Sequence, residues 1–516
     1  MIPRIRLETG LFDSLKAILP LPNPQKKLAS ELLNFFNAKQ VLLFASGRSA
    51  LYHLLKALPQ KKVFIPAYTC AVVKEAVLLA GKQCIELDIG LETFSFGPKE
   101  LAKKIKKNSI VLATHQFGIP CEIEKIAELC KKNNCILIED NAAALGTKIN
   151  GKLTGTFGQA SILSFDYTKT LACARGGAVI FNDTELFKKT RETIPKNPKS
   201  GFSADLKRFF YVSLYNFFAS PKIYGLFTLP LLTKNSLFAD KGQISKEKNQ
   251  EYAAEMSTFQ ARLGLSQFKR LSETIAKRKA IAGFFQKALE KSRLKIPNKN
   301  LLKESVLIRF PIIVPTKNKI VFYNACRKKG LDLGFSFSYS LKGLPNANIA
   351  AQKVLDLPFY SSLSRKEREK IVSIVKNVSE NSETLELIAL ATRQQKLQKI
   401  LFLLEESRKG RVVGAIGIVR RFGLPFLFLA VDPAFQGRGI GSRLMKKFLE
   451  KIPKKYGFIF LSQNTKIAEH IYLKAGFRFI GEKKCSKFMV LERRNGPITG
   501  FFVAIASFFL KPGIKG

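Results

Sequence analysis

Lys169 and Asp140 are two side chains of the N-terminal half whose surroundings favour chemistry. Lys169 lies in the run SFDYTKTLACARGG. A loop lysine near a phosphate and a cationic ring can have a lowered pKa, and its neutral amine can form the imine that anchors an aldehyde cofactor. Lysine is common throughout this chain, so an ordinary solvated lysine is the alternative interpretation.

Asp140 ends the apolar run of CILIEDNAA. A carboxylate at the tip of a strand can pair with a protonated pyridine nitrogen and keep the ring an electron sink. An aspartate in this position can equally cap the helix that follows a strand. The residues alone leave both roles open.

A glycine with small polar neighbours, in the run SGRSAL, lies between the apolar run VLLF and the helical pattern SALYHLLKAL. Gly47 and Arg48 would then stand at a helix N-terminus, where free backbone N–H groups and the helix dipole attract a phosphate. A capped helix after a tight turn explains the same residues without a ligand.

A second glycine turn lies in the C-terminal part, where the run VDPAFQGRGIG precedes the helical pattern SRLMKKFLEKI. Glycines two residues apart in a strand-to-helix turn let a pyrophosphate approach backbone N–H groups, and Arg438 adds a positive charge. The candidate contacts are Val431, Gln436, Gly437, Arg438, Gly439, Ile440 and Gly441.

The elements that must position these residues fall into two patterns. The N-terminal half alternates short apolar strands with amphipathic stretches, which predicts a mainly parallel sheet with helices on both faces and ligands beyond the carboxyl ends of the strands. Beyond a helix that ends near Asn377, apolar strands at 400–404, 412–419 and 426–431 indicate an antiparallel meander. We therefore expect domains at 1–380 and 383–495, with an apolar insertion at 205–235 and an apolar tail at 496–516.

Five motifs occur in order: SGRSAL, PAYT, THQFG, IEDNAAALG and SFDYTKTLACARGG. Together with FQARLGLSQFKRL and LDLPFYSSLS, they resemble the DegT-type family of sugar aminotransferases over about residues 30–378. The resemblance implies an α/β fold of type I for enzymes dependent on pyridoxal phosphate, with a small C-terminal subdomain. It implies transfer of an amino group, usually from glutamate, to a keto-sugar attached to a nucleotide, in a homodimer.

Carried over by position, the resemblance implies that Lys169 is the Schiff-base lysine and proton shuttle. Asp140 would pair with the pyridinium nitrogen, and Ser164 with the Gly47-Arg48 turn would hold the cofactor phosphate. The lysine also argues against the dehydratase branch, which has histidine at this position.

The chain departs from the family pattern near the cofactor. Cys70 replaces an aromatic residue that stacks on the ring, and Ala143 replaces a glutamine or histidine. Ala253 and Glu255 replace an asparagine and an arginine, and Arg175 replaces an acidic residue. These departures bear on cofactor affinity, on substrate choice and on the predicted dimer, because the asparagine normally reaches the neighbouring subunit's cofactor phosphate.

The C-terminal glycine turn, with Asn464 and the run AEHIYLKAGF, resembles the GNAT superfamily of N-acyltransferases over about residues 383–493. The superfamily is a mixed α+β fold that uses acetyl-CoA. The resemblance implies that residues 436–441 cradle the CoA pyrophosphate, that Asn464 helps to place CoA or water, and that Tyr472 donates a proton to the departing thiolate. A core aromatic on an amphipathic helix is the alternative for Tyr472, and no acid can be singled out as the general base.

Composition limits the partners. Lysine and arginine outnumber aspartate and glutamate by 86 to 39, a formal charge of +47. Because no nucleic-acid-binding signature accompanies this charge, we expect no nucleic-acid partner and favour anionic substrates such as nucleotide sugars and CoA, or an anionic membrane surface. The eight cysteines and three histidines show no metal-ligand spacing, so we expect free thiols and no metal site.

Residues 209–232 form an apolar stretch with a single charge at Lys222 and with prolines at positions 221 and 230. A membrane span, an interfacial or re-entrant segment, and a buried or dimer-interface element are all open. A second apolar run, residues 498–510, is too short to cross a membrane but long enough to lie on one. Because the N-terminus lacks the apolar core of a secretory signal, we expect a cytoplasmic protein that can touch the inner face of the membrane.

Together these patterns predict a bifunctional transferase that aminates a keto-sugar and N-acylates an amine, in the synthesis of a surface polysaccharide. The alternative is an acyltransferase whose N-terminal half is a non-catalytic binding scaffold.

Overall fold

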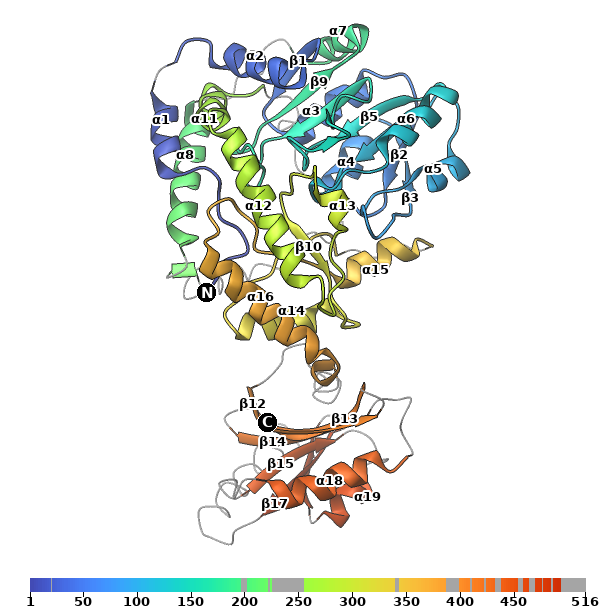
Figure 1. The fold of residues 1–516 in the computed structure, drawn as a ribbon, viewed down its shortest axis with the longest axis vertical. Coiled ribbons are helices and arrows are strands. Elements are labelled where there is room, and N and C mark those ends of the chain that lie inside the picture. Colours follow the sequence, from blue (N-terminus) through green and yellow to red (C-terminus); the bar gives the residue numbers. More distant parts are fainter. Residues whose placement is uncertain are drawn as a thin grey trace, which may run out of the picture. The chain divides into compact units, whose positions relative to one another are not determined.

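A computed structural model describes residues 1–19, 21–195, 202–220, 223–224, 255–338, 343–386, 399–408, 411–421, 424–431, 438–452, 458–463, 469–475, 477–483 and 486–492. The chain forms two compact units (Figure 1). The first comprises Met1–Pro315 and Cys326–Lys376, and the second comprises Thr316–Ala325 and Asn377–Gly516.

A seven-stranded sheet forms the centre of the first unit, in the order β1-β9-β8-β5-β4-β2-β3. Only β9 runs antiparallel to its neighbours β1 and β8, and the remaining neighbours pair in parallel, which confirms the predicted mainly parallel sheet. The strands are β1 (Gln40–Phe44), β2 (Lys62–Pro66), β3 (Gln83–Leu87), β4 (Ile110–Thr114), β5 (Ile136–Asp140), β8 (Ala160–Ser164) and β9 (Gly177–Phe181).

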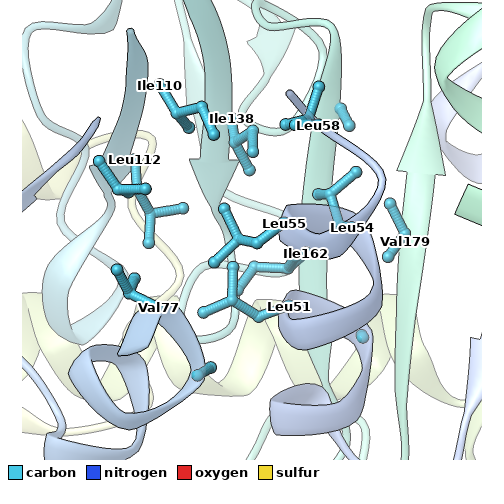
Figure 2. Packing of buried hydrophobic residues seen from close by; sticks show 14 of the residues in the cluster. Leu51, Leu54, Leu55, Leu58, Val77, Ile110, Leu112, Ile138, Ile162 and Val179 are labelled. Atoms are coloured by element: carbon cyan, nitrogen blue, oxygen red, sulfur yellow. The ribbon is translucent and has the colours of Figure 1, made fainter. Parts of the chain in front are cut away.

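Helices cover both faces of this sheet because apolar residues of adjacent positions point to opposite sides of a strand. On β5, Ile138 packs with α3 and α4, whereas Leu137 packs with α5 and α6. Figure 2 shows the first of these cores, in which Leu51, Leu54 and Leu55 of α3 meet residues from several strands. The helices around the sheet are α2 (Pro24–Phe36), α3 (Gly47–Lys56), α4 (Ala71–Leu79), α5 (Pro98–Lys104), α6 (Ile123–Lys132), α7 (Thr184–Glu192) and α11 (Thr258–Phe268).

A small subdomain follows the long helix α12 (Leu271–Leu289), as the family resemblance implied. It contains an antiparallel strand pair, β10 and β11. Helix α16 ends at Glu380 rather than near Asn377, and further helical residues follow at 382–386. The remaining elements up to residue 380 are α1 (Leu11–Ile18), η1 (Gln116–Gly118), β6 (Lys148–Ile149), β7 (Lys152–Leu153), α8 (Phe202–Phe218), α13 (Lys299–Leu302), β10 (Phe310–Ile313), α14 (Lys319–Lys328), α15 (Pro345–Lys353), β11 (Val354–Leu357) and α16 (Arg365–Glu380). Most of α14 and the last residues of α16 belong to the second unit.

The second unit contains a six-stranded sheet in the order β12-β13-β14-β15-β17-β16. The first three strands form the predicted antiparallel meander, and β14 and β15 pair in parallel. Helix α18 packs its apolar stripe on this sheet. The elements are β12 (Lys399–Arg408), β13 (Arg411–Arg421), β14 (Leu424–Val431), α18 (Ile440–Lys451), β15 (Phe458–Gln463), α19 (Glu469–Lys474), β16 (Arg478–Lys483) and β17 (Ser486–Glu492).

The predicted apolar segment 209–232 lies partly in α8, and its residues 221–222 and 225–232 lie outside the described residues, as does the run 498–510. Among the helices that the structure describes, none combines the length and the hydropathy needed to cross a bilayer.

Candidate functional site

The predicted phosphate site brings together residues from three elements of the first unit. Gly47 begins α3 directly after β1, and a Cβ atom at this position would lie 2.9 Å from Ser164 Cβ and 3.1 Å from Ser164 Oγ. A Cβ atom at Gly177 would lie 2.5 Å from the Gly47 nitrogen. Both positions therefore require glycine, because Gly47 packs against the Ser164 side chain and Gly177 packs against the Gly47 backbone. The N-terminus of α3 lies at this contact, and backbone N–H groups at a helix start favour an anion.

The cap of α3 is also present, as the alternative interpretation required. Ser46 Oγ accepts a hydrogen bond of 3.1 Å from the Ser49 N–H. A capped helix and an anion site are compatible here, because one side-chain acceptor satisfies only one of the first N–H groups of a helix. Arg48, the second predicted residue, lies in the first turn of α3.

Asp140 is the last residue of β5 and is buried. Its Oδ1 accepts from the Ala142 N–H at 3.1 Å, and its Oδ2 accepts from Thr114 Oγ1 at 3.5 Å. The alternative role as a helix N-cap is wrong, because turns and not a helix occupy residues 141–147. Burial raises the pKa of Asp140, while the Ala142 N–H and the positive charge of Lys169 lower it.

A buried network beneath Asp140 fixes the end of β5. Glu139 accepts hydrogen bonds from the N–H groups of Gly155, Phe157 and Gly158 at 2.7, 2.6 and 2.9 Å. The same carboxylate lies 3.0 Å from His115 Nε2. Burial alone would lower the pKa of His115, but the interactions with Cys121 and Glu139 outweigh it and raise this pKa to about 10.

Lys169 lies in the loop that follows β8, and its N–H donates to the Asp166 carbonyl at 3.0 Å. Burial lowers the pKa of Lys169, and the Arg309 guanidinium lowers it further, against the opposing charges of Asp166 and Asp140. Since Lys169 and Asp140 each shift the pKa of the other, the structure brings the two predicted residues into one electrostatic environment. The lowered pKa favours the neutral amine that a nucleophile requires.

Helix α11 clamps the loop that carries Lys169. Gln260 Nε2 donates to the carbonyls of Ala45 and Ala174 at 3.2 and 3.4 Å. Gln267 Oε1 accepts from the Ala172 N–H at 3.2 Å. Ala174 and Arg175 hold φ angles of 53° and 75°, a region that residues with a side chain rarely adopt, so the loop keeps a strained turn that α11 stabilises.

Three groups near the site did not stand out in the sequence: the pair His115 and Glu139, the glutamines of α11, and Arg309. Arg309 precedes β10, and its Nη1 donates to Ser336 Oγ at 3.2 Å and to Asp356 Oδ2 at 3.3 Å. The signal that could have revealed it is a single charge within the apolar run VLIRFPII.

The structure describes several of the residues at which this chain departs from the family pattern, and they lie near the elements that carry Lys169, Asp140 and Gly47. Cys70 precedes α4 and is among the groups that shift the pKa of Lys169. Ala143 is half-buried in the turns after Asp140. Glu255 is exposed, and its backbone forms an isolated bridge with Phe44 of β1. Ala253 lies outside the described residues.

The glycine turn of the second unit is described from Arg438 onward. Gly439 is the N-cap of α18 with φ 71°, and Ile440 and Gly441 begin the helix. Val431 ends β14, while Gln436, Gly437 and Asn464 lie outside the described residues. Among the described residues, β14 and β15 pair only at Phe426 and Phe460, near the start of β14 and away from its Val431 end.

Tyr472 lies on α19 and is buried in the core that α18 shares with the sheet. Its ring centroid is 6.1 Å from that of Phe477. A Cβ atom at Gly441 would lie 3.4 Å from Ile471 Cδ1, which places α19 beside the first turn of α18. Burial raises the pKa of Tyr472 to about 12, so its hydroxyl carries a proton at neutral pH.

Two family models match the chain. The DegT/DnrJ/EryC1/StrS aminotransferase family matches residues 22–376, and an acetyltransferase (GNAT) domain matches residues 398–479. The order of the two matches confirms the predicted fusion.

Curated relatives include two proteins named GDP-perosamine synthase. The protein from Vibrio cholerae is 30% identical over 167 residues, which cover 32% of this chain and 46% of that protein. The protein from Escherichia coli O157:H7 is 35% identical over 147 residues, which cover 28% of this chain and 40% of that protein. These matches therefore span less than half of each relative.

Solved structures match over a longer stretch. Helicobacter pylori PseC, described as an aminotransferase involved in the biosynthesis of pseudoaminic acid, is 20% identical with a TM-score of 0.57, and the match covers 73% of this chain and 98% of that chain. The aminotransferase TlmJ from Streptoalloteichus hindustanus is also 20% identical, with a TM-score of 0.56 and the same coverage. At this identity, the likeness shows the fold alone.

Proposed function

The chain belongs to the DegT/DnrJ/EryC1/StrS aminotransferase family, and on that premise we propose that its first unit aminates a keto-sugar attached to a nucleotide. Pyridoxal phosphate is the cofactor of this family. The amino donor that we propose is glutamate. The observation that carries the proposal is the shared environment of Lys169 and Asp140 in a buried site beside the N-terminus of α3.

The residues present fit this cofactor at both of its charged ends. Gly47 lies so close to Ser164, and Gly177 so close to Gly47, that a Cβ atom at either glycine would clash, so the chain here keeps its backbone exposed where a phosphate suits the N–H groups at the start of α3. Burial raises the pKa of Asp140, so its ionised form needs a nearby cation, and a protonated ring nitrogen supplies one. When bound, the cofactor supplies an electron sink for charge that develops on the substrate carbon.

The side chains then divide the remaining tasks. The Nζ atom of Lys169 anchors the cofactor and moves a proton, because a lowered pKa favours the neutral amine. Asp140 holds the ring nitrogen in its protonated form, and the network of Glu139 and His115 fixes the strand end from which Asp140 projects. The backbone at Gly47 and the hydroxyl of Ser164 orient the phosphate.

The second unit carries the GNAT match, and acetyl-CoA is the co-substrate of such domains. We propose that it transfers an acetyl group to an amine. Residues 436–441 with Val431 would bind the CoA pyrophosphate at the start of α18, where the dipole and free N–H groups favour an anion and Arg438 adds charge. Tyr472, protonated at neutral pH, would donate a proton to the departing thiolate, and Asn464 would help to place CoA.

The two reactions fit in sequence, because amination of a keto-sugar yields a primary amine and an acyltransferase consumes one. We therefore propose consecutive amination and N-acetylation of one sugar, for use in a surface polysaccharide. The proposed boundaries are residues 1–380 for the first domain, 383–495 for the second and 496–516 for an apolar tail. A homodimer and a peripheral membrane contact at the cytoplasmic face complete the proposal.

A spectrum of the purified full chain with pyridoxal phosphate, wild type beside Lys169→Ala, tests the first reaction. We expect a visible absorbance band that requires Lys169 and that collapses when glutamate is added. The absence of any band that depends on Lys169 would favour the second candidate, an acyltransferase with a binding scaffold, which Cys70, Ala143 and Glu255 also support. The mass of the product after addition of acetyl-CoA tests the second reaction.

A further inference from the structure

Helices α1 and α8 lie side by side at one edge of the first unit (Figure 1). Together they expose an apolar surface. The side chains that form it come from both helices and from the C-cap of α1. We call this surface the α1/α8 face, and it consists of Phe12, Leu15, Ile18, Leu19, Leu206, Phe210, Leu214 and Phe217.

The spacing of these residues places them on one stripe of each helix. On α8 they occur at positions 206, 210, 214 and 217, a helical repeat of three or four residues. The exposed fractions of Phe210, Leu214 and Phe217 are 53%, 55% and 60%, so more than half of the surface of each residue is accessible to solvent. An isolated exposed leucine needs no explanation, but a contiguous apolar stripe marks an interaction site.

The opposite stripe of the same helices already forms the core. Ala17 of α1 and Val212 of α8 are buried in one cluster with Phe259 and Leu263 of α11. Asn216 Nδ2 of α8 donates to the Thr9 carbonyl at 2.9 Å, which fixes α8 beside the start of α1. The exposed apolar residues of the α1/α8 face are therefore not needed to attach α8 to the first unit. A helix face that meets only water usually carries polar residues, so these apolar residues need another explanation.

The charges around the face are positive. Asp13 and Asp205, the acids of the two helices, pair with Arg270 at 2.8 Å and with Arg208 at 2.7 Å. Lys16 and Lys207 are exposed, and within the described part of the chain neither has a carboxylate partner. The whole chain carries +47, so a second copy would bring the same charge to the face, whereas an anionic surface complements it.

We propose that the α1/α8 face docks the protein onto an anionic lipid bilayer, with both helices lying in the plane of the headgroups. Phenylalanine and leucine side chains would enter the boundary of the acyl chains, and Lys16 and Lys207 would meet anionic headgroups. The 17 residues of α8 span about 26 Å as a helix, less than the hydrocarbon core, so the helix lies on the bilayer and does not cross it. The inference rests on the membrane contact proposed above and not on either chemical step.

Docking would bring the loop of Lys169 near the membrane surface. Tyr211 of α8 is half exposed, and its ring centroid lies 4.7 Å from that of Tyr167, which precedes Lys169 by two positions in the same loop. Helix α8 thus carries part of the proposed lipid-binding face and also packs, through Tyr211, against the loop that holds Lys169.

The chain contains no tryptophan, so one introduced tryptophan reports on its own surroundings. We would compare full-length Phe210→Trp with Leu79→Trp, a control on α4 whose native side chain is 43% exposed. With phosphatidylglycerol vesicles we expect a blue shift for Phe210→Trp alone, and with phosphatidylcholine vesicles a much smaller one. No shift with either vesicle would overturn the proposal. A shift that needs no vesicles and grows with protein concentration would assign the face to a second copy instead.

Sedimentation with the same vesicles tests the face in the full-length protein without the probe. We expect the double variants Phe210→Asp with Leu214→Asp, and Lys16→Glu with Lys207→Glu, each to weaken binding to phosphatidylglycerol vesicles by about tenfold or more. Amination and acetylation in vesicle-free solution should not change, because these positions are exposed and outside both sites. Unchanged vesicle binding in both variants would overturn the proposal even if both chemical activities are present.

Discussion

The two proposed sites of this chain differ in the groups that form them: side chains in the first unit and backbone N–H groups in the second. In the first unit, the proposed chemistry depends on side chains that must meet: Lys169 and Asp140 shift each other's pKa in a buried environment. In the second unit, the proposed CoA site depends on backbone N–H groups at the start of α18, where Gly439 holds a left-handed conformation. Loss of one catalytic side chain should abolish activity at a side-chain site. At a backbone site, a substitution that disturbs the geometry should only weaken ligand affinity.

The largest difference between the two sites should appear in Lys169→Ala. Loss of the amine removes both the anchor of the cofactor and a group that moves the proton, so we expect amination to fall by at least about 10⁴-fold. Acetylation of an added amine should stay at its wild-type rate, because Lys169 belongs to the first unit. Steady-state rates of the two reactions, measured on the same preparation, check both expectations.

Lys148→Ala is a matched control, because Lys148 is an exposed lysine on β6. It should leave both rates unchanged. Loss of acetylation together with amination in Lys169→Ala would contradict the independence of the two sites.

The network beneath Asp140 should contribute stability that depends on pH. The pKa of His115 rises from its ordinary 6.5 to about 10 in the folded chain, so its protonated form stabilises the fold fully below about pH 6.5 and this contribution disappears as pH rises through about 10. In His115→Gln, we expect the free energy of unfolding to drop by about 3 kcal/mol near pH 6 and by less near pH 10. Urea unfolding of the full chain, followed by circular dichroism, measures both values.

His53→Gln provides the comparison within the same unit. The His53 Nδ1 atom lies 3.0 Å from the Thr193 hydroxyl, a partner that does not ionise. Equal losses of stability for His115→Gln at pH 6 and at pH 10 would refute the charged pairing with Glu139.

Sequence patterns predicted the parallel sheet and the meander, because alternating apolar runs report directly on burial. The fusion and the roles of Lys169 and Asp140 came from the family resemblance, since the residues alone left both roles open. Asp140 ends β5, and Lys169 lies in the loop after β8. The clamp by Gln260 and the approach of Arg309 could not be predicted, because they join segments that lie far apart in the chain. For Tyr472, one helical pattern suits both a core aromatic and a proton donor, and the structure shows its ring buried in the core of the second unit.

Tyr472→Phe separates those two roles, since it keeps the ring that packs near Phe477 and removes only the hydroxyl. If the hydroxyl donates a proton, as we propose, kcat for acetylation should fall by roughly 10²-fold while the melting temperature and the KM for acetyl-CoA stay near their wild-type values. An unchanged kcat would assign Tyr472 to the core alone.

The smallest effect should follow from Gly439→Ala. Alanine at φ 71° costs about 1–2 kcal/mol, and its Cβ atom would meet only the end of the flexible Arg443 side chain, 3.2 Å away. If acetyl-CoA binds the turn in this conformation, we expect its affinity to fall by about tenfold in titration calorimetry. Gly441→Ala is the paired variant, because its Cβ atom would make an ordinary contact of 3.4 Å with Ile471 and its backbone is helical. A loss in Gly441→Ala that equals the loss in Gly439→Ala would show that CoA contacts the first turn of α18 directly, and that contact rather than backbone strain sets the affinity.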